Sequence, residues 1–102
     1  MKAARVPRLS SKEQLILELL IAHRSAMYGL ELVAASRRRL KRGTVYVTLG
    51  RMEAKKLVTS QQEDAPIEAG GLPRRVYTPT VLGRRLVDAQ ARLARLLPEF
   101  GR

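Results

Sequence analysis

The sequence predicts a mainly α-helical fold that contains one β-hairpin. Three stretches with helical periodicity come first, two strand-like segments around a Gly- and Pro-containing loop follow, and one more helical stretch closes the chain. The 102 residues, 45% of them hydrophobic, suffice for a single domain with one modest core. The order helix, helix, helix, hairpin, helix is that of a winged helix-turn-helix with an extra C-terminal helix.

Charge and composition narrow the classes of function. The chain has 20 Lys and Arg against 9 Asp and Glu, a formal net charge of +11, which indicates an anionic partner such as nucleic acid. It has no Cys and one His, so we expect no disulfide, metal or other cofactor. No catalytic constellation or Gly-rich phosphate loop is present, which argues against an enzyme. No apolar run is long enough to span a membrane, and we expect a cytoplasmic protein.

The first two helices follow a basic segment. We expect residues 1–9 to form a flexible arm. Ser10 and Ser11 both offer an N-cap for a helix over about 12–23, with Glu13 and Gln14 placed to complete a capping box. This helix is apolar on more than one face, so we expect one face to contact a partner chain. A second helix is predicted over about 28–36.

The strongest functional pattern lies between residues 37 and 56, which hold eight Lys and Arg and a single acid, Glu53. The segment 37–42 is predicted to be a basic turn anchored by Leu40, and 43–56 a helix that buries Val45, Leu49 and Met52. A helix in the major groove needs cations for phosphates and short groups for base edges. On this basis Arg51 suits guanine, Val47 and Thr48 suit a thymine methyl, and the alternative is a solvated basic face. The predicted contacts here are Arg38, Arg39, Lys41, Arg42, Thr44, Tyr46, Val47, Thr48, Arg51 and Lys55.

Two strands over 57–62 and 74–78 are predicted to form a wing at 57–79, which completes a DNA-binding domain over 10–80. Arg74 and Arg75 lie at its base and are predicted to contact DNA. The loop at 63–73 carries Glu63, Asp64 and Glu68, which phosphate would repel, so we expect the tip to point away from DNA or to remain mobile. In the alternative interpretation the two arginines pair with these acids.

The last helix is predicted over 81–97, with Thr80 as N-cap and 98–102 as a tail. Five apolar residues recur there at spacings of 4, 3, 4 and 3, which is typical of a helix–helix seam. We interpret it as a dimerisation helix; the alternative is packing on the first helix of its own chain. A two-fold dimer would place its two recognition helices about 34–36 Å apart, so that they face successive major grooves. The predicted dimer residues are Leu82, Leu86, Ala89, Leu93, Leu96 and Leu97, with Ile16 and Leu20.

Several segments resemble the PadR-like transcriptional regulators. They are MYGLEL at 27–32, GTVYVTLGRMEAKKLV at 43–58 and RRVYTPT at 74–80, followed by Gly83. The resemblance implies a short form of the family: a winged-helix homodimer that represses transcription at a palindromic operator, with Thr44, Tyr46 and Arg51 on the reading helix. The sequence departs from the family pattern at Lys56, where Gly is usual, and at Val47, where Pro is common.

Two questions stay open at the level of sequence. A winged-helix module of this charge could instead bind structured RNA or a protein partner. The sequence also leaves open whether a small-molecule effector exists; it contains no Trp.

Overall fold

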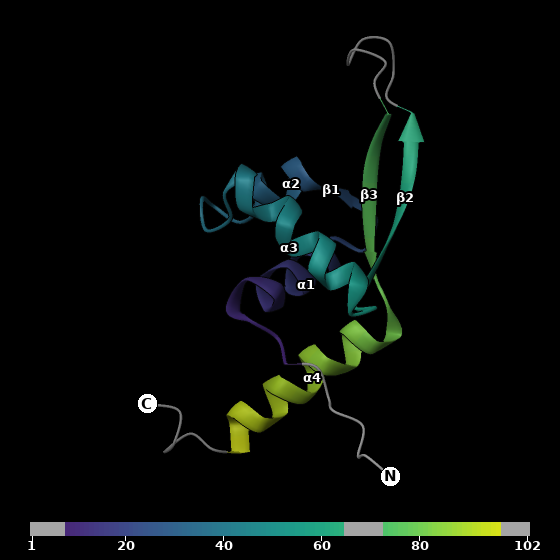
Figure 1. Cartoon of the computed structure of the whole chain (residues 1–102). Coiled ribbons are helices and arrows are strands. Elements are labelled where there is room, and N and C mark those ends of the chain that lie inside the picture. The colour runs from purple at the N-terminus through teal and green to yellow at the C-terminus, as the bar shows by residue number, and fades with distance from the viewer. Residues whose placement is uncertain (1–7, 65–72, 97–102) are drawn as a thin grey trace.

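The computed structural model describes residues 8–64 and 73–96. Within them the order is α1 (Ser11–His23), β1 (Met27–Tyr28), α2 (Gly29–Ala35), α3 (Arg42–Ala54), β2 (Val58–Asp64), β3 (Pro73–Pro79) and α4 (Val81–Leu96). The tip of the wing and α4 lie at opposite ends of the molecule, with α2 beside the wing strands and α1 next to α4 (Figure 1). The predicted helical fold with a wing is confirmed. The predictions for residues 1–7 of the arm, Glu68, Leu97 and the tail at 98–102 fall outside the described residues.

The helix starts and stops follow local chemistry. The Ser10 hydroxyl accepts a hydrogen bond from the backbone N–H of Glu13, and the Glu13 carboxylate accepts one from the backbone N–H of Ser10. These two bonds confirm the predicted capping box, with Ser10 as the N-cap. At the end of α3 the N–H of Leu57 donates to the carbonyl of Met52, and the N–H of Lys56 donates to that of Glu53. This pair of bonds is a Schellman motif, so α3 ends at Ala54 rather than at the predicted residue 56.

The sheet has one strand more than predicted. β1 pairs antiparallel with β3 through Met27↔Tyr77 and Tyr28↔Val76, giving the strand order β1-β3-β2. The predicted two-stranded wing, β2 and β3, is confirmed, and the structure adds β1 as a third strand that the sequence did not predict. A two-residue strand carries no alternation that a sequence pattern can detect, and long-range pairing with β3 creates it.

The two wing strands are longer than the sequence predicts. Pairing runs from Val58↔Pro79 to Asp64↔Pro73, so Glu63 and Asp64 belong to β2 rather than to the tip. Their polarity favours a loop locally, but the ladder to β3 continues through them because both strands are exposed there and need no apolar face.

The core forms around α1, which packs against α2, α3, β3 and α4. The predicted stripe of Val45, Leu49 and Met52 is confirmed, since all three side chains are fully buried. Ile16 and Leu20 are also buried in the core of their own chain, so the prediction that they face a partner is wrong. The core consists of Ile16, Leu17, Leu20, Met27, Leu32, Leu40, Val45, Leu49, Met52, Leu57, Val58, Tyr77 and Leu86.

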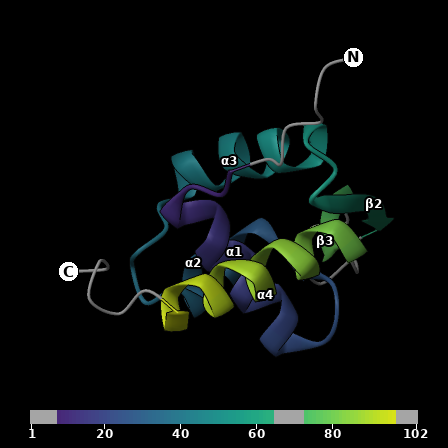
Figure 2. The ribbon, with the colours of Figure 1, turned by 90° about the horizontal axis from the view of Figure 1, so that it is seen from below.

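A hydrogen-bonded junction fixes α4 to the rest of the domain. The Thr80 hydroxyl lies 2.7 Å from the Lys56 carbonyl and 3.0 Å from the Leu57 carbonyl, and it accepts the N–H of Gly83, which confirms Thr80 as the cap. A Cβ at Gly83 would collide with the Leu57 carbonyl and lie 2.9 Å from Leu17 Cδ2. The helix thus approaches the α3–β2 junction closely and runs across α1 (Figure 2).

Candidate nucleic-acid interface

Two buried residues, Ser36 and Leu40, hold the basic turn between α2 and α3. The Ser36 hydroxyl donates to the Val33 carbonyl at 2.7 Å and accepts the N–H of Leu40 at 2.9 Å. Ser36 and Leu40 are both buried, which confirms Leu40 as the anchor of the turn. Because both ends of the turn are buried, the residues between them face outward: Arg37, Arg38 and Arg39 are exposed.

Two of these arginines adopt an unusual backbone. Arg37 has φ 53 and Arg38 has φ 73, a left-handed conformation that costs L-residues about 1–2 kcal/mol each. The bonds of Ser36 and the burial of Leu40 hold the chain in it. The turn is therefore strained, and it holds a group of cations next to the first turn of α3. Lys41 and Arg42 are also exposed there.

The exposed face of α3 differs from the predicted one at Thr48. Tyr46 and Val47 are 46% and 57% exposed, and Arg51 is exposed beside them. Thr48 is 5% exposed and its hydroxyl donates to the Thr44 carbonyl at 2.9 Å, so its predicted place on the reading face is wrong. Residue 48 lies on the side of the helix that packs on the core, next to Leu49 and Met52.

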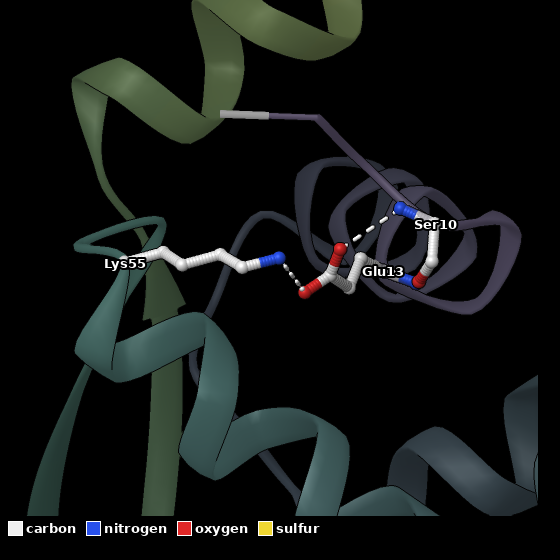
Figure 3. Close-up of polar contacts among 3 residues, drawn as sticks. All are labelled: Ser10, Glu13 and Lys55. Atoms are coloured by element: carbon white, nitrogen blue, oxygen red, sulfur yellow. Dashed lines mark hydrogen bonds and ion pairs between the residues drawn. The ribbon is translucent and has the colours of Figure 1, made fainter. Parts of the chain in front are cut away.

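Lys55 has a partner inside the protein. Its ammonium lies 2.8 Å from the buried carboxylate of Glu13, which also caps α1 (Figure 3). Burial raises the pKa of this carboxyl, but the hydrogen bonds from Lys55 and Ser10 outweigh burial and the net pKa lies below its ordinary value. The ion pair of Lys55 with Glu13 thus links α3 to α1, and Lys55 is not among the DNA contacts proposed below.

The two arginines of the wing lie on opposite faces of β3, as neighbours in a strand must. Arg75 donates to the Ser60 hydroxyl at 3.3 Å, and that hydroxyl donates to Glu53 of α3 at 2.6 Å, so Arg75 is on the side toward α3. Arg74 stacks on the ring of Tyr28, 3.8 Å from its centroid, and lies 4.0 Å from Glu63. Arg74 thus has one of the wing's acids as a neighbour, at the outer limit of an ion pair.

Sequence reasoning missed Tyr28 and Glu63. The Tyr28 hydroxyl donates to the Glu63 carboxylate at 2.8 Å, across 35 residues of sequence, and this bond raises the pKa of the phenol. Gly29, the residue after Tyr28, leaves room for the ring of Tyr46, because a Cβ at position 29 would lie 2.5 Å from that ring. Tyr28 on β1 and Glu63 on β2 are brought together because both strands pair with β3, and no local motif signals this arrangement.

The described residues therefore present cations on one turn, on the start of α3 and at the base of the wing. Within 8–64 and 73–96 no three His, Cys, Asp or Glu side chains gather as a candidate metal site. No helix in the same ranges is long and apolar enough to cross a bilayer.

Two helices joined by a tight turn, with a β-hairpin beside them, define a winged helix-turn-helix protein. The chain belongs to the PadR-like family of transcriptional regulators, whose family model matches residues 16–89. The resemblance seen in the sequence is thereby confirmed. A comparison with the sequences of curated proteins gives no match.

Solved structures agree with this assignment. A PadR family transcription regulator from Clostridium difficile is 28% identical, with a TM-score of 0.71, over 89% of this chain and 94% of that one. A PadR family transcriptional regulator from Eggerthella lenta is 26% identical, with a TM-score of 0.66, over 88% of this chain and 80% of that one. A PadR-like transcription factor from Bacteroides fragilis, 23% identical with a TM-score of 0.72 over 87% of this chain and 84% of that one, supports the fold alone.

Proposed function

We propose that this chain is a cytoplasmic repressor that binds a pseudopalindromic operator as a homodimer. The observation that carries the proposal is the gathering of exposed cations around the exposed face of α3 in a chain of the PadR-like family. A solvated basic face would not require two arginines in left-handed conformations beside one helix end.

In this proposal α3 enters the major groove. Arg51 pairs with guanine, and Val47 contacts a thymine methyl, because its exposed isopropyl group offers no hydrogen bond. Tyr46 and the half-buried Thr44 contact a phosphate or a base edge near the start of the helix. The phosphate contacts come from Arg38, Arg39, Lys41 and Arg42, and from Arg74 and Arg75 of the wing.

The homodimer would form through α4. On the side of the helix that also carries the buried Leu86, the side chains of Leu82, Leu93 and Leu96 are 39%, 55% and 75% exposed, and Ala89 is exposed as well. Leu93 and Leu96 line an open groove of about 380 Å³ with Arg85, Asp88 and Arg92, which offers apolar and charged groups to a second copy. Leu86 is 8% exposed and packs on its own core, so we leave it out of the proposed dimer surface.

A titration tests the proposal. The chain is added to duplex DNA and to structured RNA at matched salt, and we expect tighter binding to the duplex. Once a preferred duplex is known, Arg51→Ala should cost about 1–3 kcal/mol on it and much less on random DNA. Preference for RNA, or equal losses on both duplexes, would contradict the proposed role of α3.

A further inference from the structure

A notch lies between the start of α2, α3 and the wing. It has a volume of about 450 Å³, and all three tyrosines of the chain line it: Tyr28, Tyr46 and Tyr77. Arg74 and Arg75 line it as well, and the Arg74 guanidinium lies against the Tyr28 ring. Tyr46 also belongs to the exposed face of α3, so the notch adjoins the face of α3 that is proposed to enter the major groove.

One acid faces the donors of this notch. A single oxygen of the Glu63 carboxylate accepts the Tyr28 hydroxyl at 2.8 Å and lies 4.0 Å from the Arg74 guanidinium. Arg74 is held in place by stacking on the Tyr28 ring, 3.8 Å from its centroid. A phenol and a guanidinium that converge on one anionic oxygen are also a donor set suited to phosphate.

The Glu63 carboxylate does not satisfy the hydrogen-bond donors of Arg74. The 4.0 Å separation from Arg74 is well beyond the roughly 2.7–2.9 Å of a charge-assisted hydrogen bond. The Arg74 Nε is buried and donates to no acceptor among the described residues. Arg74 is therefore pre-positioned by its aromatic neighbour but has unused hydrogen-bonding capacity.

We propose that Tyr28 and Arg74 form a seat for one phosphodiester of the DNA backbone, and that Glu63 occupies this seat in the free protein. Glu63 then acts as an intramolecular competitor, and the phosphate displaces it when DNA enters. This inference rests on the proposed DNA binding, to which it adds one specific contact and a built-in opponent of that contact.

The competitor lowers the affinity for DNA in general and leaves the ratio of operator to random-sequence affinity unchanged. Phosphate contacts carry no sequence information, so Glu63 weakens binding to every duplex by the same factor. Glu63 therefore reduces the concentration of protein held on random DNA and on the operator alike.

The test compares Glu63→Gln with Asp64→Asn in the full-length chain. Both variants remove one negative charge from the same strand, but only the first releases Arg74, and glutamine still accepts the Tyr28 hydroxyl. Affinity for a random-sequence duplex is measured by fluorescence anisotropy at several salt concentrations. We expect Glu63→Gln to bind the duplex more tightly than both the wild type and Asp64→Asn at every salt concentration, with a dependence of log K on log salt close to that of the wild type, because the phosphate reaches the seat in both chains and only its competitor is removed.

A third variant, Arg74→Gln, tests whether the effect of Glu63 acts through Arg74. In the Arg74→Gln background, Glu63→Gln should give no more than the change seen with Asp64→Asn, while thermal melting shows that each variant is folded. Equal gains in affinity for Glu63→Gln and Asp64→Asn would overturn the inference, because net charge alone would then explain both. If the wild-type chain does not bind duplex DNA at all, the proposed function itself fails.

Discussion

Lys56 adopts a left-handed backbone conformation, φ 63, at the C′ position of the Schellman motif that ends α3. Glycine adopts this conformation without the steric cost that L-residues carry. This explains why the family usually has Gly at this point. Lys56→Gly should therefore raise the free energy of unfolding by about 0.5–1 kcal/mol, after the larger unfolded-state entropy of glycine is subtracted.

Urea unfolding measures the effect of this substitution. Lys56→Ala is the control, because alanine removes the same charge but keeps the backbone strain, so it should give no comparable gain. A Lys56→Gly chain that is less stable than the Lys56→Ala chain would show that the left-handed conformation carries no cost here.

Glu13 makes stability depend on pH. Its folded-state pKa lies below the ordinary value of 4.5, so its contribution is fully present above that pH and is lost as the pH falls through the lower folded-state pKa. Glu13→Gln should cost about 1–3 kcal/mol at pH 7, since it breaks a buried charge-assisted contact. At pH 3 the difference from the wild type should be smaller.

The matched control for this prediction is Glu18→Gln on the same helix. Glu18 is exposed and accepts only the Gln14 amide at 3.2 Å among the described residues, so its replacement should change stability by less than about 0.5 kcal/mol. Unfolding curves at both pH values decide the matter. A Glu13→Gln penalty that is the same at pH 7 and pH 3 would contradict the lowered pKa.

At the scale of elements, α4 depends on one close approach. A Cβ at Gly83 would collide with the backbone of Leu57 and press on Leu17, whereas a Cβ at Gly50 on the exposed face of α3 would meet nothing within 4 Å. Gly83→Ala should therefore destabilise the chain by about 1–3 kcal/mol. Gly50→Ala should stabilise it by about 0.5–1 kcal/mol, since alanine is the better helix former. Thermal or urea unfolding would contradict this account if both substitutions changed stability in the same direction.

The elements also show how far sequence reasoning reaches. The capping box at Ser10, the anchor Leu40 and the buried stripe on α3 depend on residues within one helix or turn, and all were predicted correctly. The strand β1 and the bonds Lys55–Glu13 and Tyr28–Glu63 join residues 35 to 50 positions apart, and local periodicity carries no information about them. Thr48 was misplaced because a polar residue in a helix can turn its hydroxyl back to the backbone and still be buried.

At the scale of the whole molecule, the proposed homodimer places the reading surface and the partner surface at opposite ends. The tip of the wing lies at one end and α4 at the other (Figure 1), and Leu82, Leu93 and Leu96 of α4 are exposed in the single chain. Leu93→Glu should convert a dimer into a monomer, because it places a charge in the apolar seam. Val81→Glu, at a 64% exposed position of α4 outside that seam, is the matched control and should leave the dimer intact.

Sedimentation velocity distinguishes these cases directly. A wild-type chain that sediments as a monomer at the concentrations where it binds DNA, or a Leu93→Glu chain that still dimerises, would contradict the proposed interface.

The central claim is that this molecule reads a specific operator as a two-fold dimer. Selection of bound sequences from a random duplex pool, followed by the salt dependence of binding to the selected site, tests it most directly. We predict an inverted repeat whose half-sites are centred about one helical turn, roughly 34–36 Å, apart. Recovery of no preferred sequence, together with steeply salt-dependent binding, would mean that the net charge of +11 serves non-specific binding and would contradict the claim.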